Sequence, residues 1–260
     1  MLSTNELKQL RSLQQKKFRK EYQQFLVEGT KSVLEVFQSD YMVEKIYATQ
    51  QWVDKHPDFS MEVHLVSPKE CERISSFTTS PEVFALVKMK EEEVFKADKC
   101  KKLLLLDGIK DAGNFGTIIR TLDWFEIQSV VCSEDTVELY NPKTIQASMG
   151  SFTRVNVFYR DLKTFILENK DNYTFFGTFM EGTSIRNTSF PEYSAIVLGS
   201  ESTGISNEII NLINKKLSIP RGKSENKENK AESLNVSLAT AIVCYELVSV
   251  HKVENSRFKI

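Results

Sequence analysis

The spacing of hydrophobic and polar positions changes repeatedly along this chain of 260 residues and predicts alternating strands and helices. Short apolar runs in the first third have the length of strands, and the segments between them carry apolar residues at helical spacing. The order of these elements predicts a small α/β domain over residues 1–90. Its expected strands span residues 25–27, 43–48, 61–66 and 83–88, and its expected helices span 5–17, 31–37 and 68–75.

The alternation is stronger in the rest of the chain. The run Leu103-Leu-Leu-Leu106 is apolar at every position, which is typical of a parallel strand buried on both faces. Repeated strand–helix units predict an α/β domain with a parallel sheet over residues 103–260. The charged segment 91–102 is the expected linker. Further strands are expected at 129–132, 173–179, 194–198 and 217–219, and helices at 117–125, 142–149, 160–168, 207–213 and 233–250.

The composition is that of an ordinary globular protein, and the distribution of charge is more informative than its total. Charged residues make up 27% and hydrophobic residues 41% of the chain, and the formal net charge is −1. The first twenty residues hold six basic residues and a single acid, Glu6. Such a patch can hold phosphate groups, although a solvated helix face gives the same pattern. The six are Lys8, Arg11, Lys16, Lys17, Arg19 and Lys20.

Cysteine and histidine positions argue against a metal site. Cys71, Cys100, Cys132 and Cys244 are scattered and the three histidines do not cluster, so we expect neither a zinc site nor a disulfide framework. No apolar stretch reaches the roughly 20 residues that cross a bilayer, and the first residues lack the pattern of a signal peptide. We therefore expect a cytoplasmic protein with no membrane or metal partner.

The segment from Asp107 to Gly116 joins an expected strand to an expected helix and contains three glycines. Glycine lets the backbone approach a ligand closely, and the start of a helix favours an anion. A dinucleotide site has the same placement, and an acid at the end of the next strand, Glu134 or Asp135, counts in its favour. The spacing Gly-Asn-x-Gly counts against it, because that site needs G-x-G-x-x-G. A tight turn without a ligand is a further interpretation.

Two charged residues stand out beside the expected loops. Arg120 follows Asn114 by six residues within an apolar helix, so we expect both side chains at the mouth formed by the carboxyl ends of the strands. Arg120 suits a phosphate or ribose clamp because its fork of donors is fixed, and a salt bridge to Glu201 is the structural alternative. Glu201 follows the strand 194–198; it suits a group that orients Arg120 or the incoming ribose, but without its flanking pattern a surface or capping carboxylate is the favoured interpretation.

Three segments together resemble the motifs of a known family. They are Asn114-Phe-Gly-Thr-Ile-Ile-Arg120, Ile196-Val-Leu-Gly-Ser-Glu201-Ser-Thr-Gly204, and Ile219-Pro220 followed by Ser233-Leu-Asn235-Val-Ser237. They are similar to the SpoU-type (TrmH-like) RNA ribose 2′-O-methyltransferases of the SPOUT superfamily. The resemblance implies methyl transfer from S-adenosylmethionine to a ribose 2′-hydroxyl in structured RNA. It also implies a deep trefoil knot in the parallel-sheet domain and a homodimer packed through that domain.

The same resemblance implies roles for individual residues. Arg120, Asn114, Glu201 and Asn235 are the expected catalytic residues. A guanidinium keeps its proton, so we expect Arg120 to orient the 2′-hydroxyl and neutralise a phosphate rather than act as a base. Ser233 also suits the N-cap of the last helix. The expected cofactor-binding residues are Thr178, Gly182, Leu198, Gly199, Gly204, Ile219, Pro220, Ser233, Leu234 and Ser237.

The segment 16–31 is similar to the substrate-binding domain of that family, a small fold akin to certain RNA-binding ribosomal proteins. Phe18, Tyr22 and Phe25 are interleaved with basic residues, which suits RNA, although aromatic residues serve a core equally well. The resemblance favours ribosomal over transfer RNA. The expected RNA-binding residues are Lys16, Lys17, Arg19, Lys20 and Lys31.

Two segments stand apart from these assignments. The gap between Pro220 and Ser233 is longer than the family pattern, which bears on how the loop 221–232 closes over a cofactor. The segment Ser148-Met-Gly150 resembles a family segment to which we assign no role.

Three other functions remain open at this point. A non-catalytic RNA-binding protein on the same scaffold fits the long loop, although the intact Asn114, Arg120, Glu201 and Asn235 argue against it. A transfer RNA 2′-O-methyltransferase fits the same motifs. A nicotinamide-dependent oxidoreductase fits the strand–loop–helix arrangement, but the missing G-x-G-x-x-G argues against it.

Overall fold

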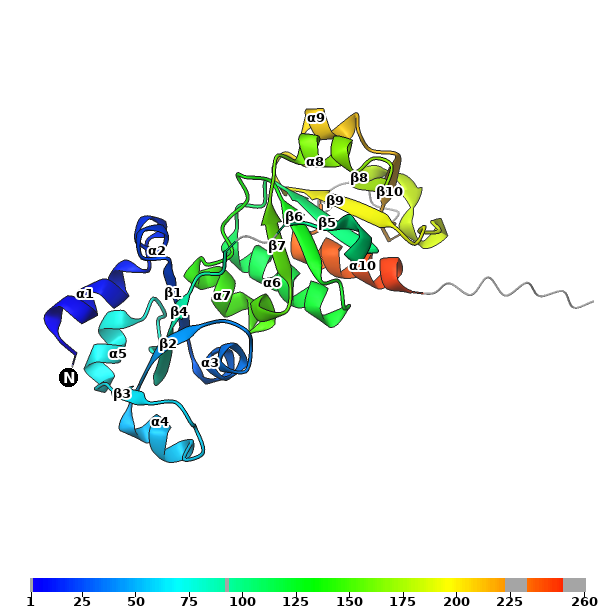
Figure 1. Ribbon diagram of the computed structural model, residues 1–260. Coiled ribbons are helices and arrows are strands. Elements are labelled where there is room, and N and C mark those ends of the chain that lie inside the picture. The colour runs from blue at the N-terminus through cyan, green and yellow to red at the C-terminus, as the bar shows by residue number, and fades with distance from the viewer. Residues whose placement is uncertain (1, 92–93, 223–232, 250–260) are drawn as a thin grey trace, which may run out of the picture.

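The computed structural model describes residues 2–91, 94–222 and 233–249, and it has two lobes, each built around one sheet (Figure 1). The N-terminal lobe comprises residues 2–91, and the C-terminal lobe comprises the other described residues. Helices pack against both faces of both sheets. Within the described ranges, no helix is long and apolar enough to cross a membrane.

The N-terminal lobe has a four-stranded sheet in the order β1-β4-β2-β3. β2 runs parallel to β3, and β4 runs antiparallel to β1 and β2. The strands are β1 (Gln24–Glu28), β2 (Val43–Ala48), β3 (Val63–Leu65) and β4 (Val83–Lys88), and the helices are α1 (Thr4–Ser12), α2 (Lys16–Tyr22), α3 (Thr30–Phe37), α4 (Gln50–Lys55) and α5 (Pro68–Ile74).

Alternation along β1 divides the core of this lobe into two layers. Phe25 and Val27 belong to one apolar cluster with Val33 of α3 and Trp52 of α4. Leu26, between them, belongs to a second cluster with apolar residues of α1 and α5. Successive side chains of a strand point to opposite faces, so a run of three apolar residues supports helices on both sides of the sheet.

The C-terminal lobe has a six-stranded sheet in the order β10-β8-β9-β5-β6-β7, and all its neighbouring strands are parallel. The predicted α/β fold with a parallel sheet is confirmed. The strands are β5 (Lys102–Asp107), β6 (Ser129–Cys132), β7 (Asn156–Tyr159), β8 (Thr174–Ser184), β9 (Ser194–Gly199) and β10 (Lys215–Ser218). The helices are α6 (Ala112–Trp124), α7 (Pro142–Ser148), α8 (Leu162–Glu168), α9 (Asn207–Ile210) and α10 (Val236–Val248), with short 3-10 helices η1 (Ala97–Lys99), η2 (Ser151–Thr153) and η3 (Ile185–Asn187).

The apolar run in β5 supports the same two-sided arrangement. Leu104 and Leu106 pack with residues of α6, α7 and α10, whereas Leu103 and Leu105 pack with residues of α8 and α9. All four side chains are fully buried. β5 lies between β9 and β6, so the loops that follow these three strands meet at one edge of the sheet. Polar side chains on those loops are therefore brought together.

An aromatic cluster joins the two lobes. The ring of Phe25 in β1 lies 4.5 Å from the ring of Tyr140 and 6.0 Å from that of Phe152, measured between centroids. The ring of Tyr41 lies 5.5 Å from that of Phe152. These side chains belong to an apolar cluster that continues into α6 and α10, so the two lobes share one core.

Ion pairs flank this shared core. Arg19 of α2 is 2% exposed and pairs with Glu138, which follows β6. Arg154 pairs with Glu35 of α3 at 2.5 Å and with Asp123 of α6 at 2.8 Å. Each of these two arginines ties a helix of the N-terminal lobe to the C-terminal lobe.

The turn at Met149 and Gly150 brings the lobes close together. Both residues have positive φ, 53° and 96° respectively, so the chain reverses tightly after α7. A Cβ on Gly150 would lie 2.7 Å from Cγ of Glu35 in α3. Only glycine fits this approach, and the segment Ser148-Met-Gly150, to which the sequence assigned no role, is part of the contact between lobes.

Several elements of the N- and C-terminal lobes differ from the sequence-based expectation. The expected helix 5–17 is two helices, α1 and α2, because the chain turns between Ser12 and Lys16. The hydrophobic pattern does not predict α4, which is mostly polar and is started by Thr49, whose side chain accepts a hydrogen bond from the Trp52 N–H. It also misses β7, a short strand at the edge of the sheet.

The two helices nearest the predicted site also begin elsewhere than expected. α6 begins at Ala112, well before Thr117, because the Asp111 side chain caps it by accepting a hydrogen bond from the Asn114 N–H at 2.8 Å. α10 begins at Val236, and its N-cap is Asn235 rather than Ser233. The predicted trefoil knot and the closure of the long loop depend on residues 223–232, which lie outside the described residues, so both stay predictions.

Candidate active site

A cavity of about 770 Å³ lies where β9 and β10 end, beside β8 and the start of α10. Apolar side chains, among them Leu198, Ile219 and Leu234, form part of its wall, and Thr178, Glu201 and hydroxyl groups of the loop after β9 form the rest. Its volume is typical of sites for small-molecule cofactors, which are mostly apolar with a few convergent polar groups.

Most of the predicted cofactor-binding residues line this cavity. They come from β8, from the loop after β9, and from the segments on either side of residues 223–232. These residues line one continuous cavity, and their contact with a cofactor stays a prediction. They are Thr178, Leu198, Gly199, Gly204, Ile219, Pro220, Ser233 and Leu234.

Gly182 and Ser237 are not among the residues that line the cavity, and their predicted contact with a cofactor stays a prediction. A Cβ on Gly182 would lie 2.7 Å from the carbonyl oxygen of Lys216, so glycine there permits β8 to pack against β10. Ser237 is 7% exposed, and its hydroxyl donates a hydrogen bond to Oδ1 of Asn235 at 2.6 Å. Ser237 therefore orients the side chain of Asn235.

The loop from Gly199 to Gly204 is a compact turn that only glycines allow. A Cβ on Gly199 would lie 2.0 Å from the carbonyl carbon of Gly204. Gly204 has φ of 67°, and its N–H donates to the carbonyl oxygen of Ser200 at 2.9 Å. The turn keeps the backbone exposed along one side of the cavity and presents Glu201.

Three of the four predicted catalytic residues are joined by hydrogen bonds. Nδ2 of Asn114 donates to Oε1 of Glu201 at 2.6 Å. Nδ2 of Asn235 donates to Oδ1 of Asn114 at 3.0 Å. The Val236 N–H, at the start of α10, points to the same Oε1 of Glu201 at 3.5 Å. Segments far apart in the sequence thus place an amide, a carboxylate and a second amide in one network at the mouth of the cavity.

Asp111 supports this network by fixing the start of α6. Besides capping α6 through the Asn114 N–H, its carboxylate accepts a hydrogen bond from Nζ of Lys143 at 2.9 Å. The Lys143 hydrogen bond and the backbone hydrogen bond of Asn114 hold the pKa of Asp111 below its ordinary value. The charged carboxylate fixes the backbone from which the Asn114 side chain projects.

Arg120 lies apart from the other predicted catalytic residues. It is exposed, and six residues of helix place it about 9 Å along the axis of α6 from Asn114. Within the described residues it forms no hydrogen bond or ion pair, and Glu201 pairs with Asn114 instead. The alternative of an Arg120–Glu201 salt bridge is therefore wrong for the described residues, and the expectation that Arg120 and Asn114 reach one mouth stays a prediction.

The predicted RNA-binding residues divide into two groups. Lys17, Lys20 and Lys31 are exposed, and Lys16 is exposed with its Nζ 3.8 Å from a carboxylate oxygen of Glu138. Arg19 is buried and pairs with Glu138, so the expectation that it contacts RNA is wrong. Desolvation lowers the pKa of its guanidinium to about 10, which leaves it charged at neutral pH.

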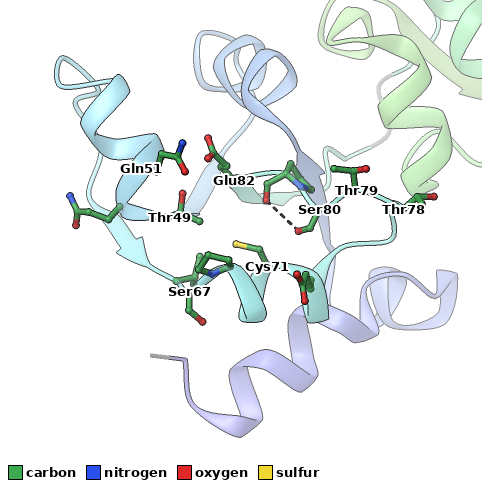
Figure 2. Close-up of a pocket in the computed structure, with 13 residues that line it drawn as sticks. Thr49, Gln51, Ser67, Cys71, Thr78, Thr79, Ser80 and Glu82 are labelled. Atoms are coloured by element: carbon green, nitrogen blue, oxygen red, sulfur yellow. Dashed lines mark hydrogen bonds between the residues drawn. The ribbon is translucent and has the colours of Figure 1, made fainter.

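A second cavity, of about 720 Å³, lies in the N-terminal lobe between the starts of α4 and α5 and the segment before β4 (Figure 2). Hydroxyl, amide and carboxylate side chains surround it, including Thr49, Gln51, Ser67, Thr79 and Glu82. None of the described residues that line it is a lysine or an arginine. It therefore lacks the positive charge that a nucleic-acid backbone requires.

The described residues of both lobes were compared with the requirements of metal sites and reactive thiols. Across the described ranges, no three histidine, cysteine, aspartate or glutamate residues are grouped so that they could hold a metal ion. The four cysteines are free, and three of them are buried. Burial raises the pKa of the Cys71 thiol to about 11, so it stays protonated at neutral pH.

Sequence reasoning missed some residues of the site. Phe179, Met180 and Ile205 line the cavity, and Asp111 and Lys143 support the network. Asp111 has a usable signal, because an aspartate three residues before Asn114 matches the spacing of an N-cap. Phe179 and Met180 have none, since nothing in an apolar strand indicates which residues border a cavity.

Comparisons with known proteins agree with the two lobes. The family described as "SpoU rRNA Methylase family" matches residues 101–245, which is more than half of the chain. The family described as "MRM3-like substrate binding domain" matches residues 4–85.

Relatives with both lobes include a methyltransferase of Bacillus subtilis. The 23S rRNA (guanosine(2553)-2′-O)-methyltransferase RlmP of that organism is 28% identical over 244 residues, which cover 93% of this chain and 95% of the relative. The 23S rRNA (guanosine-2′-O-)-methyltransferase RlmB of Blochmanniella floridana is 33% identical over 159 residues, or 59% of each chain.

Solved structures are similar over nearly the whole chain. A structure from Porphyromonas gingivalis, assigned to the TrmH family of RNA methyltransferases, has 34% identity and a TM-score of 0.81, and covers 95% of this chain and 98% of its own. The AdoMet-bound rRNA methyltransferase of Sinorhizobium meliloti has 23% identity, a TM-score of 0.80, and coverage of 95% and 96%. At that identity the second likeness shows the fold alone. With its motifs, its fold and these matches, the chain belongs to the SpoU rRNA methylase family of methyltransferases.

Proposed function

We propose that this protein transfers a methyl group from S-adenosylmethionine to a ribose 2′-hydroxyl of ribosomal RNA. The observation that carries the proposal is the hydrogen-bonded network of Asn114, Glu201 and Asn235 beside a cavity of cofactor size. Membership of the SpoU rRNA methylase family supports the type of reaction.

The residues of the cavity fit S-adenosylmethionine. Leu198, Ile219 and Leu234 offer apolar surface to a flat adenine ring, and the exposed backbone of the turn 199–204 offers hydrogen-bonding groups to its edge. When bound, the cofactor supplies an electrophilic methyl group on a positively charged sulfur. Membership of the SpoU rRNA methylase family supports this choice, and the Sinorhizobium meliloti enzyme with the same fold is bound to AdoMet in its structure.

The network acts by positioning rather than by strong base catalysis. Displacement at a methyl group requires the attacking oxygen, the carbon and the leaving sulfur to be in line. Glu201 and Asn235 hold the Asn114 amide by one N–H and by its oxygen, which leaves the second N–H of Asn114 for an oxygen of the ribose. Because Glu201 is anionic, its hydrogen bond to Asn114 is of the stronger, charge-assisted kind.

We also propose that the protein is a homodimer through one face of the C-terminal lobe, formed by α6 and α10. These helices pack against each other. α10 is apolar on both sides: Val243 and Leu247 are buried in the core, while Leu238 and Tyr245 are 58% and 60% exposed. Trp124, at the end of α6, is 83% exposed. A helix that is apolar all round is normally covered, and a second copy of this face would cover it.

Arg120 fits this proposal because it is exposed on α6 between Asn114 and Trp124. If this face forms the dimer, the Arg120 side chain would lie near the active-site cavities. There the fixed fork of guanidinium donors suits a phosphate or the 2′-hydroxyl of the RNA. Trp124→Glu places a charge in this face and should convert the dimer to monomer in analytical ultracentrifugation. A dimer that is unchanged by Trp124→Glu and by Leu238→Glu contradicts the proposed interface.

Ribosomal RNA is the proposed substrate because relatives of this chain carry names that specify 23S rRNA. Those relatives are bacterial enzymes, so the proposed reaction takes place in the cytoplasm. The test combines two assays: the thermal shift with S-adenosylhomocysteine, and tritium transfer from labelled S-adenosylmethionine to ribosomal and transfer RNA. We expect a shift, and label in ribosomal RNA that is lost in Arg120→Ala. Label in transfer RNA alone would support the alternative function, a transfer RNA 2′-O-methyltransferase. A protein that shows neither a thermal shift nor label would be a non-catalytic RNA-binding protein.

A further inference from the structure

An aromatic pair on α2 is not part of any core. The rings of Phe18 and Tyr22 are 6.1 Å apart between centroids and inclined by 19°, so they are stacked. None of the apolar clusters formed by the described residues includes either ring. Tyr22 is 40% exposed, whereas Phe25, the third aromatic residue of the segment, is fully buried.

One lysine lies beside this pair, and two more are exposed on the same short helix. The Nζ of Lys17 lies 5.6 Å from the centroid of the Phe18 ring. Lys20 is exposed on another side of the helix, and the exposed Lys16 lies 3.8 Å from a carboxylate oxygen of Glu138. A flat aromatic surface with cations around it is what single-stranded RNA binds: a base stacks on the ring, and the flanking phosphates pair with the ammonium groups. The second cavity of the same lobe has no such charge.

The helix that carries the pair is held rigidly. Between Phe18 and Tyr22, the buried Arg19 donates from Nη1 to the carbonyl oxygen of Leu13 at 2.7 Å and pairs with Glu138 through Nη2. The helix ends at Gln23, which has φ of 54°. A base bound on Tyr22 would therefore meet a surface whose orientation is fixed before binding, which lowers the entropic cost of recognition.

The anchor of α2 also connects it to the active-site edge. Glu138 stands in the loop after β6, and Val137 in that loop donates its N–H to the carbonyl oxygen of Ile109 at 2.8 Å. Ile109 lies two residues before Asp111, which caps the helix that bears Asn114. A short path of contacts thus links the aromatic pair to the catalytic network.

We propose that Phe18 and Tyr22 form a stacking platform for one unpaired nucleotide of the RNA substrate, with Lys16, Lys17 and Lys20 on the flanking phosphates. This platform deepens the proposed function and rests on it for the identity of the ligand as the RNA substrate. It holds a nucleotide at a distance from the one that is modified, so that the N-terminal lobe reads a loop or bulge of the folded RNA.

The test is direct binding of the full chain to short single-stranded RNA that carries one 2-aminopurine, whose fluorescence is quenched when it stacks on an aromatic ring. Tyr22→Ala should weaken binding by about 5- to 150-fold and abolish the quenching, because one stacked base is lost. Tyr22→Phe keeps the ring and should bind within about 2-fold of the wild type. Leu65→Ala removes another exposed apolar side chain of the lobe and serves as the matched control.

Salt dependence separates the lysines from the rings. Lys20→Ala should reduce the slope of log K against log salt by about 0.7, the contribution of one phosphate contact on a single strand, and leave the quenching intact. Tyr22→Ala should leave that slope unchanged. A general loss of structure would change both, and an exposed side chain such as Tyr22 should alter the free energy of unfolding by no more than about 0.5 kcal/mol.

Binding and quenching that are equal in Tyr22→Ala and the wild type overturn the platform, even if methyl transfer is found. So does a wild-type chain that shifts with S-adenosylhomocysteine but binds no RNA, in which case this surface serves a protein partner. Methyl transfer that fails on every RNA, with quenching intact, overturns the proposed reaction and leaves the platform standing.

Discussion

Asn114 and Glu201 are 87 residues apart in the sequence, and their side chains are joined by a hydrogen bond of 2.6 Å. Asn114 belongs to the first turn of α6, after β5, and Glu201 belongs to the loop after β9. β5 and β9 are neighbours in the parallel sheet, so their carboxyl ends deliver both side chains to one edge. The topology of the sheet assembles the site.

Replacing the charge at the centre of this network should lower the rate. In Glu201→Gln, a hydrogen bond to a charged group, worth about 1.5–3 kcal/mol, becomes a neutral one worth about 0.5–1.5 kcal/mol. The loss of about 1–1.5 kcal/mol should lower kcat/KM for methyl transfer by about 5- to 10-fold. The free energy of unfolding should change little, because the Glu201 side chain is exposed. An unchanged kcat/KM would remove Glu201 from the mechanism.

The N-cap of α6 should contribute stability with a defined pH dependence. Asp111→Ala should cost about 0.5–2 kcal/mol in urea unfolding at pH 7. The folded pKa of Asp111 is lowered below its ordinary value of 3.8, so its carboxylate stabilises the folded state above that pH. The contribution is lost as the pH falls through the lowered pKa, and the difference between variant and wild type should shrink there. A difference that grows in acid would contradict this sign.

The turn of the cavity should tolerate no side chain at Gly199. In Gly199→Ala, the new Cβ would overlap the carbonyl carbon of Gly204 at 2.0 Å, so the turn must move. We expect the thermal shift with S-adenosylhomocysteine to disappear. Gly222→Ala is the matched control, since Gly222 lines the same cavity and its Cβ would meet no atom of the described residues within 4 Å. Equal thermal shifts in the two variants would contradict the assignment of the cavity as the cofactor site.

The buried ion pair between the lobes should matter more than the exposed one beside it. Arg19→Met leaves Glu138 with Lys16, 3.8 Å away, as its one ion-pair partner among the described residues, and should cost about 3 kcal/mol, at the low end for a buried pair. Lys16→Ala removes an exposed partner and should cost less than about 1 kcal/mol. Urea unfolding of the full chain measures both, and the double variant Arg19→Met with Glu138→Leu should recover much of the loss. Equal costs for the two single variants would show that burial of Arg19 is unimportant.

The parts of the site that follow strands could be predicted from the sequence. Apolar runs such as Leu103–Leu106 mark buried parallel strands, and the chemistry of such sheets lies just beyond their carboxyl ends. This pattern predicts that Asn114 and Glu201 lie at that edge of the sheet, whereas a catalytic role for Glu201 follows only from the resemblance of its motif to the family. The N-terminal sheet was also predictable, because its strands are short apolar segments between turns.

Other roles depend on contacts that no local pattern contains. Arg19 has the sequence of a basic helix face, yet it is buried because the partner Glu138 arrives from the other lobe. Gly182 has the sequence of a ligand-binding turn, yet the backbone that approaches it is β10. Arg120 belongs to the same sequence motif as Asn114, but both residues lie in α6, and the rise of the helix separates them by about 9 Å along its axis. Burial and distance between remote segments decide each case.

The most direct test of the central claim is the chemical position of the transferred methyl group. Ribosomal RNA is incubated with the wild-type protein and tritiated S-adenosylmethionine and is then hydrolysed in alkali, which leaves the bond next to a 2′-O-methyl ribose intact. The account predicts label in an alkali-resistant dinucleotide, a lower initial rate of labelling in Glu201→Gln, and loss of the label in Arg120→Ala. Label that appears only in mononucleotides would place the methyl group on a base and contradict ribose 2′-O-methylation by this site.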